Sequence, residues 1–362
     1  MWVGRSLPRV EDSALVRGDG AFVADVAVGA WVARFVRSPV ASGRIREIHR
    51  PRGALVFTAA DLADVGEIRP ILHRDDFVPI GHPPLASDRV RFVGEPVAVV
   101  VAPTAAEAED LAEEVWAEID AEDAVVEVDL AMAPDAPVVH EVPPGFGRNT
   151  VIDARFETPG AAAAFDTAVH VVEVTVGSDR QSAMPLEARG SVASVDRRSG
   201  RITLTTSTQA PHVIRTALAD VLGIAERELQ VVAPDVGGGF GQKYSLARED
   251  VVVVWLARHL KRRVAWIEDR LENFSSAFHS RQHRYSVRGA FDADGRLLAL
   301  DADIVCNVGA YSCFPVTCGV EPLMAMAEMP GPYAVVDYRA QGQGRGHQHL
   351  PDRSLLAGCR GP

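Results

Sequence analysis

The alternation of apolar and polar residues in the first third of the chain predicts short strands. AWVARFVRS alternates as a half-buried strand does, and ALVFTAADL reads as a strand that runs into a helix start at Thr58. RVRFVGEPVAVVVA contains two β-rich runs on either side of Gly94-Glu95-Pro96. Because proline interrupts a strand, this segment predicts a hairpin-like turn between two strands.

A helix is predicted directly after these strands, in PTAAEAEDLAEEVWAEI. Thr104 can cap its first turn and Glu107 completes a capping box. Leu111, Val115 and Ile119 recur on one helical face, as in a helix packed on a core. The first third therefore reads as a compact α/β unit.

The second half repeats the mixture of strands and helices without any internal repeat. A helix over 211–222 is expected to start at a proline and end at Gly223, and a second helix is expected over 247–260. The sequence DADGR predicts a hairpin turn between the last two strands. The predicted strands span 168–176, 190–195, 201–207, 229–232, 264–268, 284–291 and 297–306.

A stretch rich in proline and glycine, AMAPDAPVVHEVPPGFGRN, separates the two halves and reads as a linker. The expected organisation has five parts. They are an N-terminal segment at 1–19, an α/β domain at 20–130, a linker at 131–148, a second α/β domain at 149–339 and a tail at 340–362.

Composition narrows the functional classes. The chain has 362 residues, of which 47% are hydrophobic and 24% charged, as in a globular protein with more than one core. A net charge of −12 argues against a nucleic-acid-binding surface. The N-terminus has no apolar segment typical of a secretory signal, and the longest apolar run, 251–257, is far shorter than the ~20 residues of a membrane helix. We therefore expect a cytoplasmic protein with no membrane span.

The cysteines do not predict a metal centre. Four cysteines in a chain of this length do not make a disulfide framework. Cys306, Cys313 and Cys318 form no C-x-x-C pair and have no nearby histidine, so buried thiols are favoured over a zinc site.

The segment VAPDVGGGFGQKY raises the main functional question, because a glycine run allows close approach of the backbone to a ligand. Gly237, Gly239 and Gly241 alternate, which does not fit the dinucleotide fingerprint G-x-G-x-x-G. Gln242 separates the last glycine from Lys243, which does not fit a mononucleotide loop. Considered alone, the glycine run therefore indicates a tight turn.

A second loop, STQAPH, occupies an equivalent position, because each loop follows a predicted strand and precedes a predicted helix. Loops at the carboxyl ends of strands are where α/β proteins bind ligands. The amide of Gln209 can donate and accept hydrogen bonds. The backbone N–H groups of Gly239, Phe240 and Gly241 can point at an anion, backed by the N-terminus of the following helix. Gln209 alone would read as a polar residue at a helix start.

An ordered series of motifs gives these loops a context. They are LPRVEDSALVRGDGAFVADV, RSPVASGRI, PPLASDRVRFVGEPVAVVVAPTAAEAEDLAEEV, MPLEARGSVA, TSTQAPH, DVGGGFGQK, RRVAWIEDRLENF and NVGAY. From residue 4 to about 339 the chain resembles the molybdopterin-binding large subunit of the xanthine dehydrogenase, aldehyde oxidase and aerobic carbon monoxide dehydrogenase family. The resemblance implies a mixed α/β (α+β) fold. It has an N-terminal α/β hammerhead domain and the first molybdopterin-binding domain, and its second molybdopterin-binding lobe is missing.

The resemblance also implies a set of cofactor contacts. Gln209 is expected to hydrogen-bond a metal oxo group or the pterin edge. Gly238, Gly239, Phe240 and Gly241 are expected to present backbone amides, with Phe240 fixing the loop by packing. The cofactor is molybdenum-molybdopterin, with the cytosine dinucleotide form as one candidate. Its dithiolene holds the metal, so no protein side chain is expected as a metal ligand.

Partners follow from the resemblance as well. An iron–sulfur subunit and an FAD subunit are expected to accompany the chain, in a dimer of heterotrimers in intact members. The expected activity is hydroxylation of an aldehyde, an N-heterocycle or a CO-like substrate with oxygen derived from water.

Other residues near the motifs are assigned structural roles. In family members the glutamate general base lies in a later domain, so we expect none in this chain. The spacing of Glu249 matches a helix of the family and not the family's general base. Glu187 and Arg189 are expected to form a structural ion pair, and His212 is also expected to be structural.

The last residues depart from the family pattern. AQGQGRGHQHLPDRSLLAGCRGP has no apolar periodicity. When it is back-translated with GC-rich codons and shifted by one base, it gives a sequence close to the A-T-N-T-x-P motif expected there. The hypothesis is that 340–362 is frameshifted readthrough and that the chain is an inactive fragment which retains no molybdenum. The alternatives are a non-enzymatic assembly module that docks an iron–sulfur subunit and, on the glycine loop alone, a nucleotide-dependent transferase.

Overall fold

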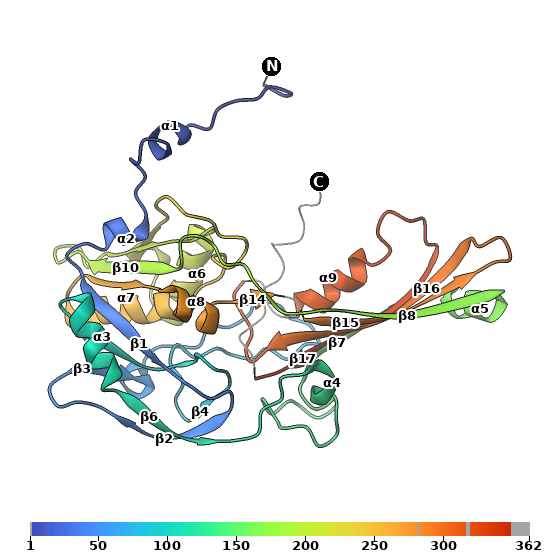
Figure 1. The fold of residues 1–362 in the computed structure, drawn as a ribbon, viewed down its shortest axis with the longest axis horizontal. Coiled ribbons are helices and arrows are strands. Elements are labelled where there is room, and N and C mark those ends of the chain that lie inside the picture. Colours follow the sequence, from blue (N-terminus) through green and yellow to red (C-terminus); the bar gives the residue numbers. More distant parts are fainter. Residues whose placement is uncertain (1, 281, 316–318, 349–362) are drawn as a thin grey trace.

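The computed structural model describes residues 2–280, 282–315 and 319–348, and its β-strands form two bodies that lie side by side (Figure 1). One body is layered and contains helices α6 and α7, and the other is an elongated sheet that extends away from it. The helices are α1 (Asp12–Leu15), α2 (Val23–Val26), α3 (Ala105–Glu113), α4 (Val128–Ala131), α5 (Ala161–Thr167), α6 (Pro211–Val221), α7 (Arg248–Leu260), α8 (Arg270–Ser276) and α9 (Val320–Glu328), with 3₁₀ turns η1 (Ala59–Leu62) and η2 (Glu226–Glu228).

The strands fall into a seven-stranded, a five-stranded, a three-stranded and a two-stranded sheet. They are β1 (Trp31–Arg37), β2 (Gly43–His49), β3 (Leu55–Thr58), β4 (Arg89–Val90), β5 (Pro96–Ala102), β6 (Trp116–Ala121), β7 (Thr150–Glu157), β8 (His170–Ser178), β9 (Gln181–Ser182), β10 (Gly190–Val195), β11 (Ile202–Thr206), β12 (Leu229–Val232), β13 (Val264–Ile267), β14 (His279–Ser280), β15 (His283–Phe291), β16 (Leu297–Gly309) and β17 (Asp337–Gly346).

The seven-stranded sheet has the order β12-β11-β10-β13-β1-β5-β3 and draws strands from both predicted units. β1 and β13 are parallel neighbours, with Trp31 opposite Val264. Segments that lie far apart in the sequence therefore share one sheet, and the two units are joined by backbone hydrogen bonds.

Strand β5, PVAVVVA, is buried along its whole length. Val99 and Val101 belong to the main core, which is built with α6 and α7, whereas Ala98 and Val100 pack in a second cluster with Leu111 of α3. Because successive side chains point to opposite faces of a sheet, helices cover β5 on both faces. This double cover explains why the segment is a continuous apolar run.

Several predicted elements are confirmed. Strands β10 and β12 have the predicted bounds, and α6 and α7 differ from prediction by one residue at one end. Strands β15 and β16 are antiparallel neighbours joined at the predicted DADGR turn. The capping box of α3 is present, with the Thr104 side chain accepting a hydrogen bond from the Glu107 N–H.

Two local predictions are wrong. The strands flanking residues 94–96 do not form a hairpin, because β4 pairs with β2 whereas β5 pairs with β1 and β3. The predicted helix face also runs too far. Helix α3 ends at Glu113, and Ile119 lies on β6, where it pairs with Ile45 of β2. In both places tertiary pairing overrides the local pattern.

The five-stranded sheet has the order β7-β17-β16-β15-β8. Strand β17 lies between β7 and β16, so the predicted boundary at 339/340 falls within a strand. Residues 349–362 of the predicted tail lie outside the described residues. Strands β7 and β17 and helices α8 and α9 are elements that the hydrophobic pattern did not indicate.

Strand β8 at the edge of this sheet is exposed on both faces. Val172, Val174 and Val176 lie on one face, opposite Gly289, Val287 and Tyr285 of β15, and each is at least half exposed. We call these three valines the β8 valine stripe. It continues the apolar face of Val287 and Tyr285, which pack against the core of this sheet.

Within the described residues no helix combines the length and apolar character that crossing a membrane requires. Cys306 and Cys313 are buried, and Cys318 lies outside the described part of the chain.

Candidate functional site

The two loops singled out in the sequence meet at one edge of the seven-stranded sheet. Strands β11 and β12 are parallel neighbours, with Leu204 opposite Val231. Their carboxyl ends therefore lie at the same edge of the sheet. The loop with Gln209 follows β11, and the glycine loop at 237–241 follows β12.

Direct contacts lock the two loops together. The N–H of Gly241 donates a hydrogen bond to Oε1 of Gln209 at 2.9 Å, and the N–H of Gln209 donates to the carbonyl oxygen of Lys243 at 2.9 Å. A Cβ atom on Gly239 would lie 2.4 Å from Cδ of Gln209. Only glycine allows this approach, so a protein side chain accounts for the missing Cβ at Gly239.

The loop backbone turns through the left-handed region, with φ values of 95° at Gly238, 49° at Phe240 and 87° at Gly241. Such values strain residues that carry a Cβ, which accounts for two of the glycines. The aromatic ring of Phe240 lies over Gly238, yet the side chain is 61% exposed. The ring thus contacts the loop at Gly238 but is not held in a core, and the expectation that Phe240 fixes the loop by packing stays a prediction.

Several hydrogen-bond donors at this junction have no protein partner. Among the described residues, none accepts a hydrogen bond from the N–H groups of Gly238, Gly239 and Phe240 or from Nε2 of Gln209. The N–H of Gly241 differs, since Gln209 already accepts from it. Helix α7 begins only at Arg248, so these amides are not in its first turn and the expected helix backing is absent.

An ion pair supports the loop from behind. Nζ of Lys243 lies 2.7 Å from Oε2 of Glu187, and the same oxygen accepts a hydrogen bond from the N–H of Gly237 at 2.8 Å. Burial lowers the pKa of Lys243, although the bond to Glu187 opposes the shift. The sequence motifs contain both residues, but their pairing is not local. The one available signal is that Lys243 is one of two lysines in the whole chain.

Glu187 and Arg189 do not pair with each other, so that prediction is wrong. Arg189 instead forms ion pairs with Glu268 at 2.5 Å and with Glu249 at 3.3 Å, all three being buried. Burial alone would lower the pKa of Arg189, but Glu268 and Glu249 raise it. Arg37 completes this group with a contact of 3.0 Å to Glu249. We call these residues the buried ion network.

The buried ion network reaches the glycine loop through Asn273 on α8. Nδ2 of Asn273 donates to Oε2 of Glu268 at 2.7 Å and to Oε1 of Gln242 at 3.1 Å. Nε2 of Gln242 donates to the carbonyl oxygen of Phe278 at 3.3 Å. The end of the glycine loop is therefore held by side chains from a helix that the sequence pattern did not indicate.

Glu249 and His212, to which the sequence assigned no catalytic role, were also located in the structure. Burial by itself would raise the pKa of Glu249, but Arg189, Arg37 and Arg248 outweigh it and hold the pKa at about 2. A carboxylate so weakly basic is unsuited to act as a general base. His212 is exposed on the first turn of α6.

Comparison with known proteins identifies the family. Residues 143–352 match the molybdopterin cofactor-binding domain, and residues 17–123 match the α/β hammerhead domain of aldehyde oxidase and xanthine dehydrogenase. The chain belongs to the molybdenum hydroxylase family, as a molybdopterin-binding large subunit, and the resemblance seen in the sequence is confirmed.

Individual relatives agree with this assignment. The chain is 34% identical over 336 residues to the nicotine 6-hydroxylase large subunit of Paenarthrobacter nicotinovorans, covering 91% of this chain and 41% of the relative. It is 34% identical over 319 residues to the carbon monoxide dehydrogenase large chain of Hydrogenophaga pseudoflava, covering 83% and 39%. The solved structure of quinoline 2-oxidoreductase from Pseudomonas putida 86 superimposes with a TM-score of 0.90 at 35% identity, covering 98% of this chain and 45% of that one. The chain thus spans less than half the length of these relatives.

Proposed function

We propose that this chain is the molybdenum-cofactor-binding part of an oxidoreductase that hydroxylates a small substrate, and that the junction of the Gln209 and glycine loops is its cofactor site. The observation that carries the proposal is the contact of Gly239 with Gln209, beside which Gln209 Nε2 and three backbone amides have no partner among the described residues. Unpartnered donors of this kind are the complement of a ligand rich in oxygen acceptors.

The residues present fit a molybdenum-molybdopterin group. The amides of Gly238, Gly239 and Phe240 would donate hydrogen bonds to its oxygen atoms, and Gln209 would donate from Nε2 while its Oε1 holds Gly241. The cofactor carries its own sulfur ligands, so the proposal requires no cysteine or histidine ligand from the protein. When bound, the group supplies two-electron redox chemistry. Glu187 and Lys243 hold the loop in place and do not reach the donors. The cytosine dinucleotide form is one candidate for the cofactor.

The length of the relatives supports a role within a larger assembly. The chain covers about 41% of the nicotine 6-hydroxylase large subunit, and the β8 valine stripe leaves apolar surface uncovered. We propose that further polypeptide, corresponding to the second cofactor-binding lobe, packs beside the cofactor and provides the general base. An iron–sulfur subunit and an FAD subunit would carry electrons away, in a dimer of heterotrimers located in the cytoplasm.

The substrate is proposed as a class. The names of two relatives contain nicotine and quinoline, which are both N-heterocycles, and another contains carbon monoxide. An N-heterocycle is the first choice for a substrate panel, followed by aldehydes and carbon monoxide.

Elemental analysis tests the cofactor site. The 362-residue chain, produced in a host that makes the molybdenum cofactor, is expected to retain far less than one molybdenum per chain. A chimera that joins residues 1–348 to the remaining part of the quinoline 2-oxidoreductase chain is expected to retain it. Near-stoichiometric molybdenum in the chain alone would show that the further lobe is not required.

A matched pair of variants in the chimera tests the residues. Gly239→Ala is expected to lose most of the metal, because its Cβ would meet Gln209 at 2.4 Å. Gly177→Ala is the control, since the nearest atom to its Cβ lies at 3.5 Å. If both variants, and Gln209→Ala as well, hold as much molybdenum and turn over as fast as the parent, the site lies elsewhere.

A further inference from the structure

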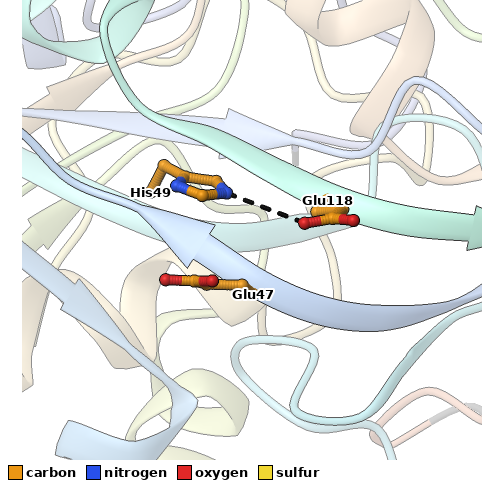
Figure 2. Close-up of side chains that lie close together, drawn as sticks. All are labelled: Glu47, His49 and Glu118. Carbon is orange, nitrogen blue, oxygen red and sulfur yellow. Dashed lines mark ion pairs between the residues drawn. The ribbon is translucent and has the colours of Figure 1, made fainter.

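The three-stranded sheet β4-β2-β6 carries a group of side chains that the cofactor site does not use. Figure 2 shows Glu47 and His49 of β2 beside Glu118 of β6. One donor atom from each of these residues lies within 4.8 Å of the other two. We call these three residues the β2–β6 cluster.

A bulge in β2 creates the cluster. Ile45 lies opposite Ile119, but Glu47 lies opposite Glu118, so one extra residue is inserted between the two pairs. Ile45 and Ile48 both pack against a buried cluster under the sheet. Two polar residues separate these isoleucines, so a regular strand could not bury both. The bulge lets both isoleucines point inward and turns Glu47 and His49 to the outer face.

The outer face therefore carries an unfavourable charge arrangement. Glu47 and Glu118 are directly opposite across the two strands, a position in which like charges destabilise a sheet. Within the described part of the chain no arginine or lysine forms an ion pair with either carboxylate, and the neighbouring Arg46 is engaged with Asp120. The one ion-pair contact of these two carboxylates within the described residues is that of Glu118 with His49, at 3.9 Å (Figure 2).

His49 is held in position to contribute a nitrogen ligand. Its ring stacks on Trp116, with ring centroids 3.8 Å apart and planes inclined by 18°. Nε2 is shielded from solvent and makes no hydrogen bond to any described residue, and it lies 3.9 Å from Oε2 of Glu118. That separation is too long for a hydrogen bond but close to the distance between two ligands of one ion.

We propose that the β2–β6 cluster binds a divalent first-row transition cation, for which Zn²⁺ is the probe, with His49 Nε2 and the carboxylates of Glu47 and Glu118 as ligands. Zinc binds imidazole nitrogen and carboxylate oxygen at about 2.0–2.2 Å, so tetrahedral ligands lie about 3.4 Å apart. The glutamate side chains are exposed and can rotate to close the remaining gap. An imidazole ligand favours such cations over Ca²⁺ and Mg²⁺, which take oxygen ligands. The bound ion would join β2 to β6 and neutralise the opposed carboxylates.

Zinc titration of the metal-free 362-residue chain tests the proposal, with a fluorescent chelator as competitor. The wild-type chain is expected to bind about one equivalent more tightly than His49→Ala does, by about ten-fold or more, because loss of a ligand costs at least as much as loss of a supporting residue. His73→Ala, which removes an exposed histidine elsewhere, is the matched control and is expected to bind as the wild type does. Equal zinc affinity in the wild type and His49→Ala overturns the proposal.

A second variant separates metal binding from folding. Glu118→Gln keeps the shape of the side chain but removes the like-charge opposition. Without metal it is expected to melt at the same temperature as the wild type or higher, whereas with zinc it is expected to melt lower than the wild type. If zinc raises the melting temperature of both proteins equally, the carboxylate is not a ligand and the proposal fails.

Trp116 supplies a direct readout. Because its ring stacks on His49, Cu²⁺ bound at Nε2 is expected to quench its fluorescence. The quenching should disappear in His49→Ala and should shrink in Trp116→Phe, where the remaining four tryptophans still emit. Quenching that is unchanged in both variants would place the copper elsewhere.

Discussion

Two strands that each carry four valines have opposite surroundings. Strand β5, PVAVVVA, is buried at every position, whereas β8, HVVEVTVGS, is exposed at all but its last residue. The first has strands on both edges and helices over both faces, whereas the second, within the described part of the chain, has one strand neighbour and no cover over its valine stripe. In β8 valine alternates with Glu173 and Thr175, a pattern that predicts one buried face, yet the valine face is exposed. Among the described residues the seven-stranded sheet is therefore covered on both faces at β5, whereas the valine face of β8 is not covered.

Buried ion pairs also distinguish the seven-stranded side of the molecule. The seven-stranded side encloses the buried ion network, with Arg189, Glu249 and Glu268 almost without exposure. Buried charges are tolerated only where partners surround them. Such an arrangement requires a finished interior, and it lies directly behind the proposed cofactor loops.

Among the variants that remove a charge, the largest expected effect comes from breaking the buried ion network. Glu249→Gln leaves the guanidinium groups of Arg37 and Arg189 short of one charge partner inside the protein. We expect the free energy of unfolding to fall by about 3–5 kcal/mol, as when one member of a buried pair is removed. Urea denaturation of both proteins at neutral pH measures the difference.

Glu109→Gln is the control for this comparison. Glu109 pairs with Arg34 but its side chain is 50% exposed, so its loss should cost less than about 1 kcal/mol. The wild-type contribution of Glu249 is present above the pKa of an unfolded glutamate and is lost as the pH falls toward 2, because the folded-state pKa is the lower one. If Glu249→Gln and Glu109→Gln lower the free energy of unfolding by the same small amount, the seven-stranded side is not the rigid half that the burial pattern indicates.

Substitution of the neighbouring residue Asp250 is expected to have a smaller effect of opposite sign, an increase in the free energy of unfolding. Burial raises its pKa to about 6, although Thr206 donates a hydrogen bond to the carboxylate at 3.1 Å. The folded state therefore holds a proton that the unfolded chain has released, and stability falls as the pH rises from about 4 to about 6. Asp250→Asn removes this loss and can still accept from Thr206. We expect it to be more stable than the wild type at pH 7.5, by on the order of 2–3 kcal/mol.

The advantage of Asp250→Asn should shrink as the pH falls from about 6 toward 4, because the folded wild type then holds its carboxyl protonated and no longer buries a charge. Denaturation curves at pH 4.5 and 7.5 measure the change. Asp220→Asn makes the same substitution on the exposed face of α6 and is the matched control. A stability difference that does not vary with pH would mean that Asp250 is not held protonated by burial.

The sequence predicted those parts of the fold that depend on neighbours in the chain. Caps, turn residues and periodicity located α6, α7, β10 and β12 to within a residue. The pairing of β1 with β13 could not be predicted, because no local pattern states which strand becomes the neighbour. Strand β17 escaped notice because DYRAQGQGRG is glycine-rich, and its place in the sheet comes from its neighbours β7 and β16.

The candidate site divides in the same way. The meeting of Gln209 with the glycine loop was predictable, since loops after parallel strands gather at one edge. The support from Lys243, Glu187 and Asn273 was not, because each contact joins separate segments of the chain. The exposure of the Phe240 ring could not be predicted for a related reason, since the sequence cannot say whether a ring in a turn has a core to enter.

The smallest expected change in stability concerns the β8 valine stripe, where the comparison of the two valine-rich strands can be tested with one substitution. Val174→Lys places a charge on a half-exposed edge strand and should change the free energy of unfolding by no more than about 0.5 kcal/mol. Val100→Lys puts the same charge into β5 and should prevent folding, because Val100 is fully buried. Since an exposed apolar edge promotes association between chains, Val174→Lys should also reduce concentration-dependent self-association, as measured by sedimentation velocity. If association persists unchanged in the triple variant with Lys at 172, 174 and 176, the stripe is not a contact surface and the contrast between β5 and β8 has no consequence in solution.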